Sequence, residues 1–193
     1  MMMSENIHYQ GFVKKKIKKK SKLRKFLSLK KLLKNYPLLN TLTSNYIYNY
    51  DKKILNNLKK FNDYNLIGIG GSALGTKAIY DFLNYKIKKK FHFYDNLQNS
   101  KILKSNINRL NIIVSKSGNT LETISNLNLI SLRQKKNKNL IITENKKNIL
   151  NKLAKKLKSE IIEHKDYIGG RYSVLSEVGM LPAELMGLDA KKI

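Results

Sequence analysis

The stretch S-K-S-G-N-T-L-E-T at residues 115–123 holds the strongest clue to the fold. It follows Leu110–Val114, an apolar and β-branched run of the length expected for a buried strand. After it, Leu121, Ile124 and Leu127 recur at helical spacing. A loop between a strand and a helix start gathers free backbone N–H groups and the positive end of the helix dipole, and this loop also carries hydroxyls. We therefore expect it to bind an anion, in particular a phosphate group.

From residue 64 onward, short apolar strands alternate with amphipathic helices. The predicted strands are 66–69, 90–94, 110–114, 140–143 and 160–163. The predicted helices are 74–83, 98–106, 120–134 and 149–157. Asn119 and Glu122 fit the N-cap of the helix at 120–134 and its reciprocal partner. Such repeated units predict an α/β fold, a three-layer parallel sheet with helices on both faces, which binds ligands beyond the carboxyl ends of its strands.

A basic region precedes these units. Residues 14–35 form a predicted helix that Pro37 ends, with apolar residues every three or four positions. A membrane-surface helix would fit this pattern, but a packing helix with a lysine-rich outer face fits it better. A tyrosine-rich connection at 46–50 and a short helix at 54–61 follow. We therefore divide the chain into an N-terminal helical segment, a main domain and a C-terminal segment, at residues 1–62, 63–165 and 166–193.

Length and composition exclude several classes of protein. The 193 residues allow one domain with a proper core and some additional helix. No apolar stretch approaches the ~18–20 residues of a membrane helix, and residues 1–10 lack the apolar core of a secretory signal. The chain has no cysteine and only three histidines, without paired spacing. We expect a cytoplasmic protein with neither disulfides nor a zinc site.

The formal charge of +26 invites a nucleic-acid interpretation. However, arginine, the usual residue for bidentate base and phosphate contacts, occurs at only four positions, 24, 109, 133 and 171. The abundant Lys, Asn, Ile and Tyr are what an AT-rich coding sequence produces. We therefore interpret the charge as solvated lysine faces and expect neither a nucleic acid nor a membrane as partner.

Two further motifs accompany the 115–123 stretch. Residues 68–73, G-I-G-G-S-A, fit the dinucleotide fingerprint G-x-G-x-x-G/A, with Asp95 after the next predicted strand. A plain tight turn or a nicotinamide-binding domain would explain this motif alone. A second hydroxyl-rich loop instead favours a small phosphorylated ligand held by both loops. Arg171 follows Gly169 and Gly170, and an isolated arginine of this kind often pairs with a surface carboxylate.

The motifs G-I-G-G-S-A-L-G, S-K-S-G-N-T-L-E-T and G-G-R-Y-S-V-L-S-E-V-G-M-L-P-A, in this order, resemble the three signatures of the glucose-6-phosphate isomerase family. The resemblance runs from about residue 66 to the end of the chain. It implies the sugar-isomerase (SIS) fold, a five-stranded parallel α/β sandwich of flavodoxin-like type. It also implies an aldose–ketose isomerase that uses no metal or organic cofactor and forms a homodimer when complete.

The resemblance assigns functional residues to all three motifs. The loop residues that hold the substrate's phosphate correspond to Ser115, Lys116, Ser117 and Thr120. Two further substrate contacts in the first loop correspond to Gly71 and Ser72. Arg171 corresponds to the arginine that stabilises the oxyanion formed while a glutamate base moves a proton between C1 and C2. Asn119 and Leu121 vary the phosphate loop, and Glu177 stands where a small residue is common.

In this family the glutamate base, a ring-opening histidine and a lysine lie beyond the arginine motif, largely in a second SIS domain. The chain ends at Ile193, soon after that motif. We therefore expect an N-terminal portion of the isomerase, with the phosphate loop and the arginine but without the proton-transfer groups. Two alternatives stay open, a stand-alone SIS module that senses a phosphosugar and, less well supported, a nicotinamide-binding Rossmann domain.

Overall fold

A computed structural model describes residues 19–97, 108–133 and 137–193. The chain divides into two compact units, residues 1–39 and residues 40–193. None of the helices in the described ranges is long and apolar enough to cross a membrane. The predicted helix at 98–106 lies outside these ranges.

The described part of the first unit is a single helix, α1 (Lys19–Asn35), followed by the start of the turn η1 (Pro37–Leu42). The helix ends before Pro37, as predicted, because proline has no N–H to donate and its ring blocks a continuing helix. Several apolar side chains of α1 are exposed, among them Phe26, Leu27 and Leu29. Residues 14–18 of the predicted helix lie outside the described part.

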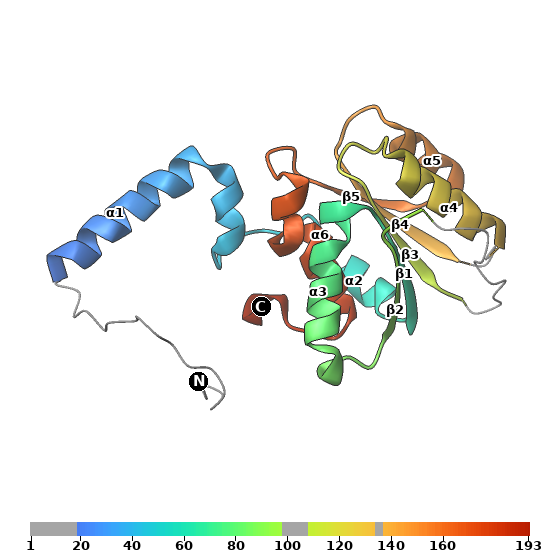
Figure 1. The fold of residues 1–193 in the computed structure, drawn as a ribbon, viewed down its shortest axis with the longest axis horizontal. Coiled ribbons are helices and arrows are strands. Elements are labelled where there is room, and N and C mark those ends of the chain that lie inside the picture. Colours follow the sequence, from blue (N-terminus) through green and yellow to red (C-terminus); the bar gives the residue numbers. More distant parts are fainter. Residues whose placement is uncertain (1–18, 98–107, 134–136) are drawn as a thin grey trace. The chain divides into compact units, whose positions relative to one another are not determined.

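The second unit is built on one parallel sheet with the strand order β2-β1-β3-β4-β5 (Figure 1). Its strands are β1 (Asp63–Ile67), β2 (Lys90–Tyr94), β3 (Leu110–Val114), β4 (Lys138–Thr143) and β5 (Glu160–Glu163). Strand β1 occupies 63–67 and not the predicted 66–69, because its ladder with β2 already begins at Asp63 and the chain leaves the sheet after Ile67. The predicted parallel α/β fold is otherwise confirmed.

Helices cover both faces of the sheet and complete three layers (Figure 1). One face carries α2 (Lys52–Leu58), α3 (Leu74–Phe82) and α6 (Glu177–Leu185), and the other carries α4 (Leu121–Arg133) and α5 (Ile149–Leu157). Because side chains alternate along a strand, Leu66 and Ile112 belong to the first core, whereas Ile67 and Ile113 belong to the second.

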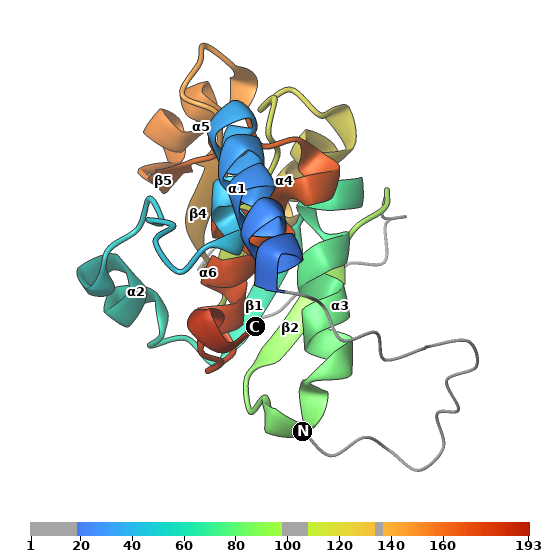
Figure 2. The ribbon, with the colours of Figure 1, turned by 90° about the vertical axis from the view of Figure 1, so that its left-hand side faces the viewer.

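Helices α3 and α6 lie side by side, as Figure 2 shows. The Thr76 hydroxyl of α3 donates a hydrogen bond to the Val178 carbonyl of α6 over 3.1 Å. At the start of α6, Gly179 permits a close approach, because a Cβ there would lie 2.0 Å from the Val174 carbonyl oxygen. Val174 belongs to the short turn η4 (Gly170–Leu175). This contact therefore holds η4 against α6, which packs beside α3 on the same face of the sheet.

A row of three asparagine amides, of which Asn65 and Asn111 are buried, fixes the strand register. Asn65, Asn111 and Asn139 are paired across β1, β3 and β4. The Asn65 amide donates to Asn111 over 2.7 Å, and the Asn111 amide donates to Asn139 over 2.8 Å. A one-residue slip would break this row and leave amides unpaired in the core, which is costly. The register in turn places the loops after β1 and β3 next to each other.

Candidate functional site

The 115–120 loop begins where β3 ends and is closed by its own hydroxyls. The Ser115 N–H still bonds to the Ile142 carbonyl of β4 over 3.1 Å, which places this residue at the sheet edge. The hydroxyls of Ser115 and Thr120 are hydrogen-bonded over 2.8 Å, and Ser115 Oγ also accepts from the Gly118 N–H over 3.2 Å. Ser115 is buried, so it braces the loop from inside.

Gly118 and Asn119 attach the loop to the start of α5. Gly118 has φ +66°, and a Cβ there would lie 2.2 Å from the Asn148 side chain, so both backbone angle and space require glycine. The prediction that Asn119 caps the next helix is wrong. Helix α4 begins at Leu121, and Asn119 Oδ1 accepts the Ile149 N–H over 3.0 Å. Because β3 and β4 are neighbours, the start of α5 lies close enough to take this side chain.

The ammonium group of Lys116 is held by the loops that follow β4 and β5. It donates to the Asp166 carbonyl over 2.6 Å and lies 3.4 Å from Glu144 Oε1. Lys146 also contacts Glu144, at 2.9 Å. Burial raises the pKa of Glu144, but the bonds and charges of Lys146 and Lys116 outweigh burial and lower it. We did not predict Glu144, although its position directly after the predicted strand 140–143 was an available signal.

The loop after β1 meets the arginine turn through a close approach of the two backbones. Gly71, in the short turn η2 (Gly70–Ser72), lies so close to η4 that a Cβ would be 2.3 Å from the Gly170 carbonyl oxygen and 2.7 Å from the Arg171 nitrogen. The Ser173 hydroxyl strengthens this contact by donating to the Gly71 carbonyl over 3.2 Å. Segments about one hundred residues apart in sequence are thereby fixed against each other.

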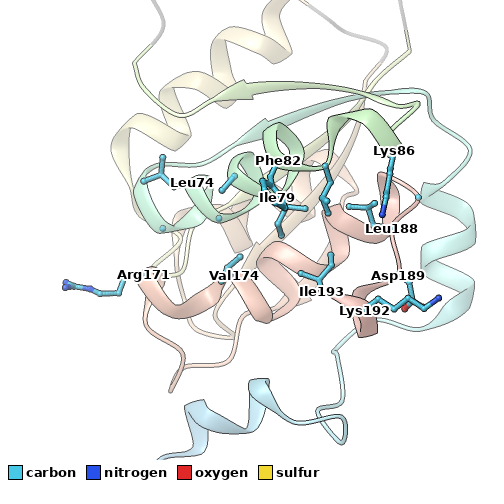
Figure 3. Close-up of a pocket in the computed structure, with 15 residues that line it drawn as sticks. Leu74, Ile79, Phe82, Lys86, Arg171, Val174, Leu188, Asp189, Lys192 and Ile193 are labelled. Carbon is cyan, nitrogen blue, oxygen red and sulfur yellow. The ribbon is translucent and has the colours of Figure 1, made fainter. Parts of the chain in front are cut away.

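Arg171 is exposed and its guanidinium is available for a ligand. Among the residues that the structure describes, none forms a hydrogen bond or ion pair with this side chain, so the surface-carboxylate interpretation finds no support there. Figure 3 shows Arg171 pointing away from the other residues that line the neighbouring cavity. An unpaired guanidinium beside a glycine turn can stabilise a negative charge brought by a ligand.

The neighbouring cavity, of about 1060 Å³, lies between α3 and the C-terminal segment (Figure 3). It reaches Gly71 and Arg171 at its edge, but most of its lining is apolar, including Leu74, Phe82 and Leu188. A phosphorylated sugar needs hydrogen-bond donors over most of its surface. We therefore place the candidate site at the carboxyl edge of the sheet, outside this cavity.

The structure gathers the predicted site residues at the carboxyl ends of two adjacent strands. Gly68 links the two loops, because a Cβ there would lie 3.0 Å from both the Ser72 side chain and the Val114 carbonyl oxygen. The third motif joins through its contact with Gly71. The predicted residues at this edge are Gly71, Ser72, Ser115, Lys116, Ser117, Thr120 and Arg171. Two of these residues are engaged within the protein in this structure. The Ser115 hydroxyl, predicted to hold the phosphate, is buried and bonded to Thr120. The Lys116 ammonium is occupied by Glu144 and the Asp166 carbonyl.

Comparison with known proteins identifies relatives over most of the chain. The family model for phosphoglucose isomerase matches residues 55–191. The probable glucose-6-phosphate isomerase of Methanococcus maripaludis is 32% identical over 211 residues, covering 100% of this chain and 48% of the relative. The glucose-6-phosphate isomerase of Methanocaldococcus jannaschii is 38% identical over 155 residues, covering 75% of this chain and 38% of the relative. The chain thus spans less than half the length of these two relatives.

A solved structure shares the fold at low sequence identity. The tagatose-6-phosphate ketose/aldose isomerase of Escherichia coli superposes with a TM-score of 0.54 at 16% identity, over 85% of this chain and 43% of that one. This likeness extends to the parallel sheet with helices on both faces. It supports the predicted SIS-type fold.

The contact between Gly71 and η4 predicts a sharp difference between two neighbouring glycine substitutions. Gly71→Ala should lower the free energy of unfolding by about 1–3 kcal/mol, because the new methyl group overlaps the Gly170 carbonyl. Gly170→Ala should change it by less than about 0.5 kcal/mol, because no atom lies within 4 Å of its added Cβ. Urea denaturation measures both. Equal tolerance of the two substitutions would contradict the close approach.

The burial of His164 predicts that the protein loses stability as the pH is lowered. It lies buried just after β5, where burial lowers the pKa of its ring below the ordinary 6.5. Below that value the unfolded chain takes up a proton before the folded protein does, so stability is complete above about pH 6.5 and falls as the pH drops. His164→Gln should remove part of the fall between about pH 5 and 6.5, above the region where carboxylates titrate.

The control for this experiment is Asn145→Gln, which changes an exposed side chain and leaves every titratable group in place. Urea denaturation at a series of pH values gives the slope for each variant. We expect Asn145→Gln to retain the slope of the unmodified protein. The same slope in His164→Gln as in the unmodified protein would show that the buried histidine does not cause the loss.

Proposed function

Because the chain belongs to the phosphoglucose isomerase family, we propose that its carboxyl-edge loops bind glucose 6-phosphate and fructose 6-phosphate for their interconversion. The observation that carries this proposal is the contact of Gly71 with Gly170 and Arg171 beside the 115–120 loop. It brings an anion-binding loop and an unpaired arginine to the same edge of one sheet. A sugar phosphate offers a negative group at one end and a reactive carbonyl at the other, which suits this arrangement.

In this proposal the 115–120 loop holds the phosphate group. The hydroxyls of Ser117 and Thr120 donate to phosphate oxygens, and the start of α4 contributes free N–H groups and the positive end of its dipole. Ser115 keeps the Thr120 hydroxyl in place through their 2.8 Å hydrogen bond. Lys116 adds positive charge nearby while Glu144 restrains it. Gly71 and Ser72 contact the sugar from the adjacent loop.

Arg171 acts at the other end of the substrate. Isomerisation moves a proton between C1 and C2, and negative charge develops on the sugar oxygen in the enediolate that forms. A guanidinium fixed beside that oxygen stabilises the charge without having to reorganise during the reaction. We propose that the glutamate base and the other proton-transfer groups belong to the part of a complete, homodimeric cytoplasmic enzyme that the matched motifs do not include.

Removal of two hydroxyls tests the phosphate assignment. The double substitution Ser117→Ala and Thr120→Ala should weaken fructose 6-phosphate binding by at least about tenfold, because two donors to a charged phosphate are lost. Isothermal titration calorimetry measures the affinity, with fructose as the uncharged comparison ligand. The matched control is Thr43→Ala with Ser44→Ala, outside the sheet edge. Unchanged binding in the first double variant would remove the phosphate assignment.

A coupled isomerase assay tests whether this chain supplies its own proton-transfer groups. We expect this chain to bind fructose 6-phosphate without measurable turnover. Robust turnover by this chain alone would contradict the assignment of proton transfer to other residues.

A further inference from the structure

Glu177 is a buried carboxylate that the proposed mechanism does not use. It is the first residue of α6, directly after the turn that carries Arg171, and its relative exposure is 0%. Its oxygens accept the Tyr46 hydroxyl at 3.1 and 3.2 Å and the Asn49 N–H at 3.0 Å. The Lys165 ammonium lies 3.8 Å away. A charge this deeply buried is costly unless such partners surround it.

Starting the helix does not require this carboxylate. Ser176 already caps α6, since its Oγ accepts the Val178 N–H over 3.4 Å. The same hydroxyl donates to the Ser173 carbonyl over 2.7 Å, which closes the turn from inside. The partners of Glu177 lie instead in two other segments, the connection at 46–49 and residue 165. Glu177 therefore connects the start of α6 to those two segments.

One of these segments leads to the phosphate loop. Lys165 contacts Glu177, donates to the Ile47 carbonyl over 2.8 Å and lies over the Tyr46 ring at 4.0 Å. The next residue, Asp166, accepts the Lys116 ammonium through its carbonyl over 2.6 Å. Two consecutive residues thus connect Glu177 to a member of the 115–120 loop.

On its other side, the turn is attached to the first loop. The Ser173 hydroxyl bonds to the Gly71 carbonyl over 3.2 Å and to the Gly170 carbonyl over 2.7 Å. The arginine turn is therefore restrained from both directions, by Gly71 on one side and by Glu177 on the other. A continuous set of contacts runs from Lys116 through residues 165–166 and Glu177 to the turn of Arg171.

We propose that Glu177 is a positioning residue, which sets the Arg171 turn at a fixed separation from the 115–120 loop. The inference rests on the proposed function, in which a phosphosugar contacts both at once. Binding at two points is strong only when the two points are already at the right separation, because a misplaced partner forfeits its contact or requires ordering on binding. Glu177 supplies that restraint without touching the ligand.

A double-mutant cycle with 6-phosphogluconate tests this role. This probe carries a phosphate for the loop and a carboxylate at C1 for Arg171. With Arg171 present, Glu177→Gln should weaken its binding by about tenfold. In the Arg171→Met background the same substitution should change binding less than about twofold, because Glu177 acts through the arginine. Affinity for inorganic phosphate, which occupies the loop alone, should stay within about twofold throughout.

Three further variants keep the test informative. Glu184→Gln lies on the same helix, where Glu184 accepts the Tyr50 hydroxyl over 3.4 Å, and should leave 6-phosphogluconate binding unchanged. Tyr46→Phe removes one hydrogen bond from Glu177 but keeps the ring, so it serves if Glu177→Gln fails to fold. Lys165→Met should act in the same direction as Glu177→Gln, because it removes the contact between the Lys165 ammonium and Glu177. Circular dichroism melting confirms that each variant is folded.

The outcomes separate this inference from the proposed function. If the unmodified protein binds neither 6-phosphogluconate nor fructose 6-phosphate, the proposed function fails and the inference fails with it. If the unmodified protein binds both but Glu177→Gln has the same effect with and without Arg171, only the positioning role is overturned. A loss of binding that depends on Arg171 supports the positioning role.

Discussion

The close approach of Gly71 to Gly170 and Arg171 is the contact on which the candidate site depends. No side chain other than hydrogen fits at residue 71, since a Cβ would lie 2.3 Å from the Gly170 carbonyl oxygen. The contact joins the loop after β1 to a turn that the chain reaches only after completing the sheet. Without it, the loop after β1 would not fix Arg171 near the 115–120 loop, and the proposed site would lack its second charged group.

The parallel α/β fold and both loops were predictable because they rest on local patterns. Apolar strands alternating with amphipathic helices imply parallel strands, and parallel strands place their following loops at one edge. The 115–120 loop could thus be assigned from strand, hydroxyls and helix start alone. Assigning Arg171 to the same edge needed the resemblance, because nothing local indicates that residue 171 returns to residue 71.

Contacts between distant segments account for what the sequence did not predict. Asn119 is a residue type that often caps helices, yet its side chain accepts the Ile149 N–H at the start of α5. Lys116 was expected to face the ligand, but Glu144 and the Asp166 carbonyl hold it. The amide row through Asn111 is equally hidden, because it exists only once three strands are in register. In each case the side chain's hydrogen-bond partner comes from another β-α unit. The spacing of residues within one unit cannot predict that partner.

The central claim is that two loops and the arginine turn form one phosphosugar site at the carboxyl edge of the sheet. Amide chemical-shift mapping by NMR during a titration with fructose 6-phosphate tests this claim most directly. We predict that the largest shifts fall together on residues 115–120, on Gly71 and Ser72, and on Arg171, with one common affinity. Shifts confined to the apolar lining of the cavity, such as Leu74, Phe82 and Leu188, would contradict it. Shifts in the 115–120 loop without any at Gly71 and Arg171 would also contradict it.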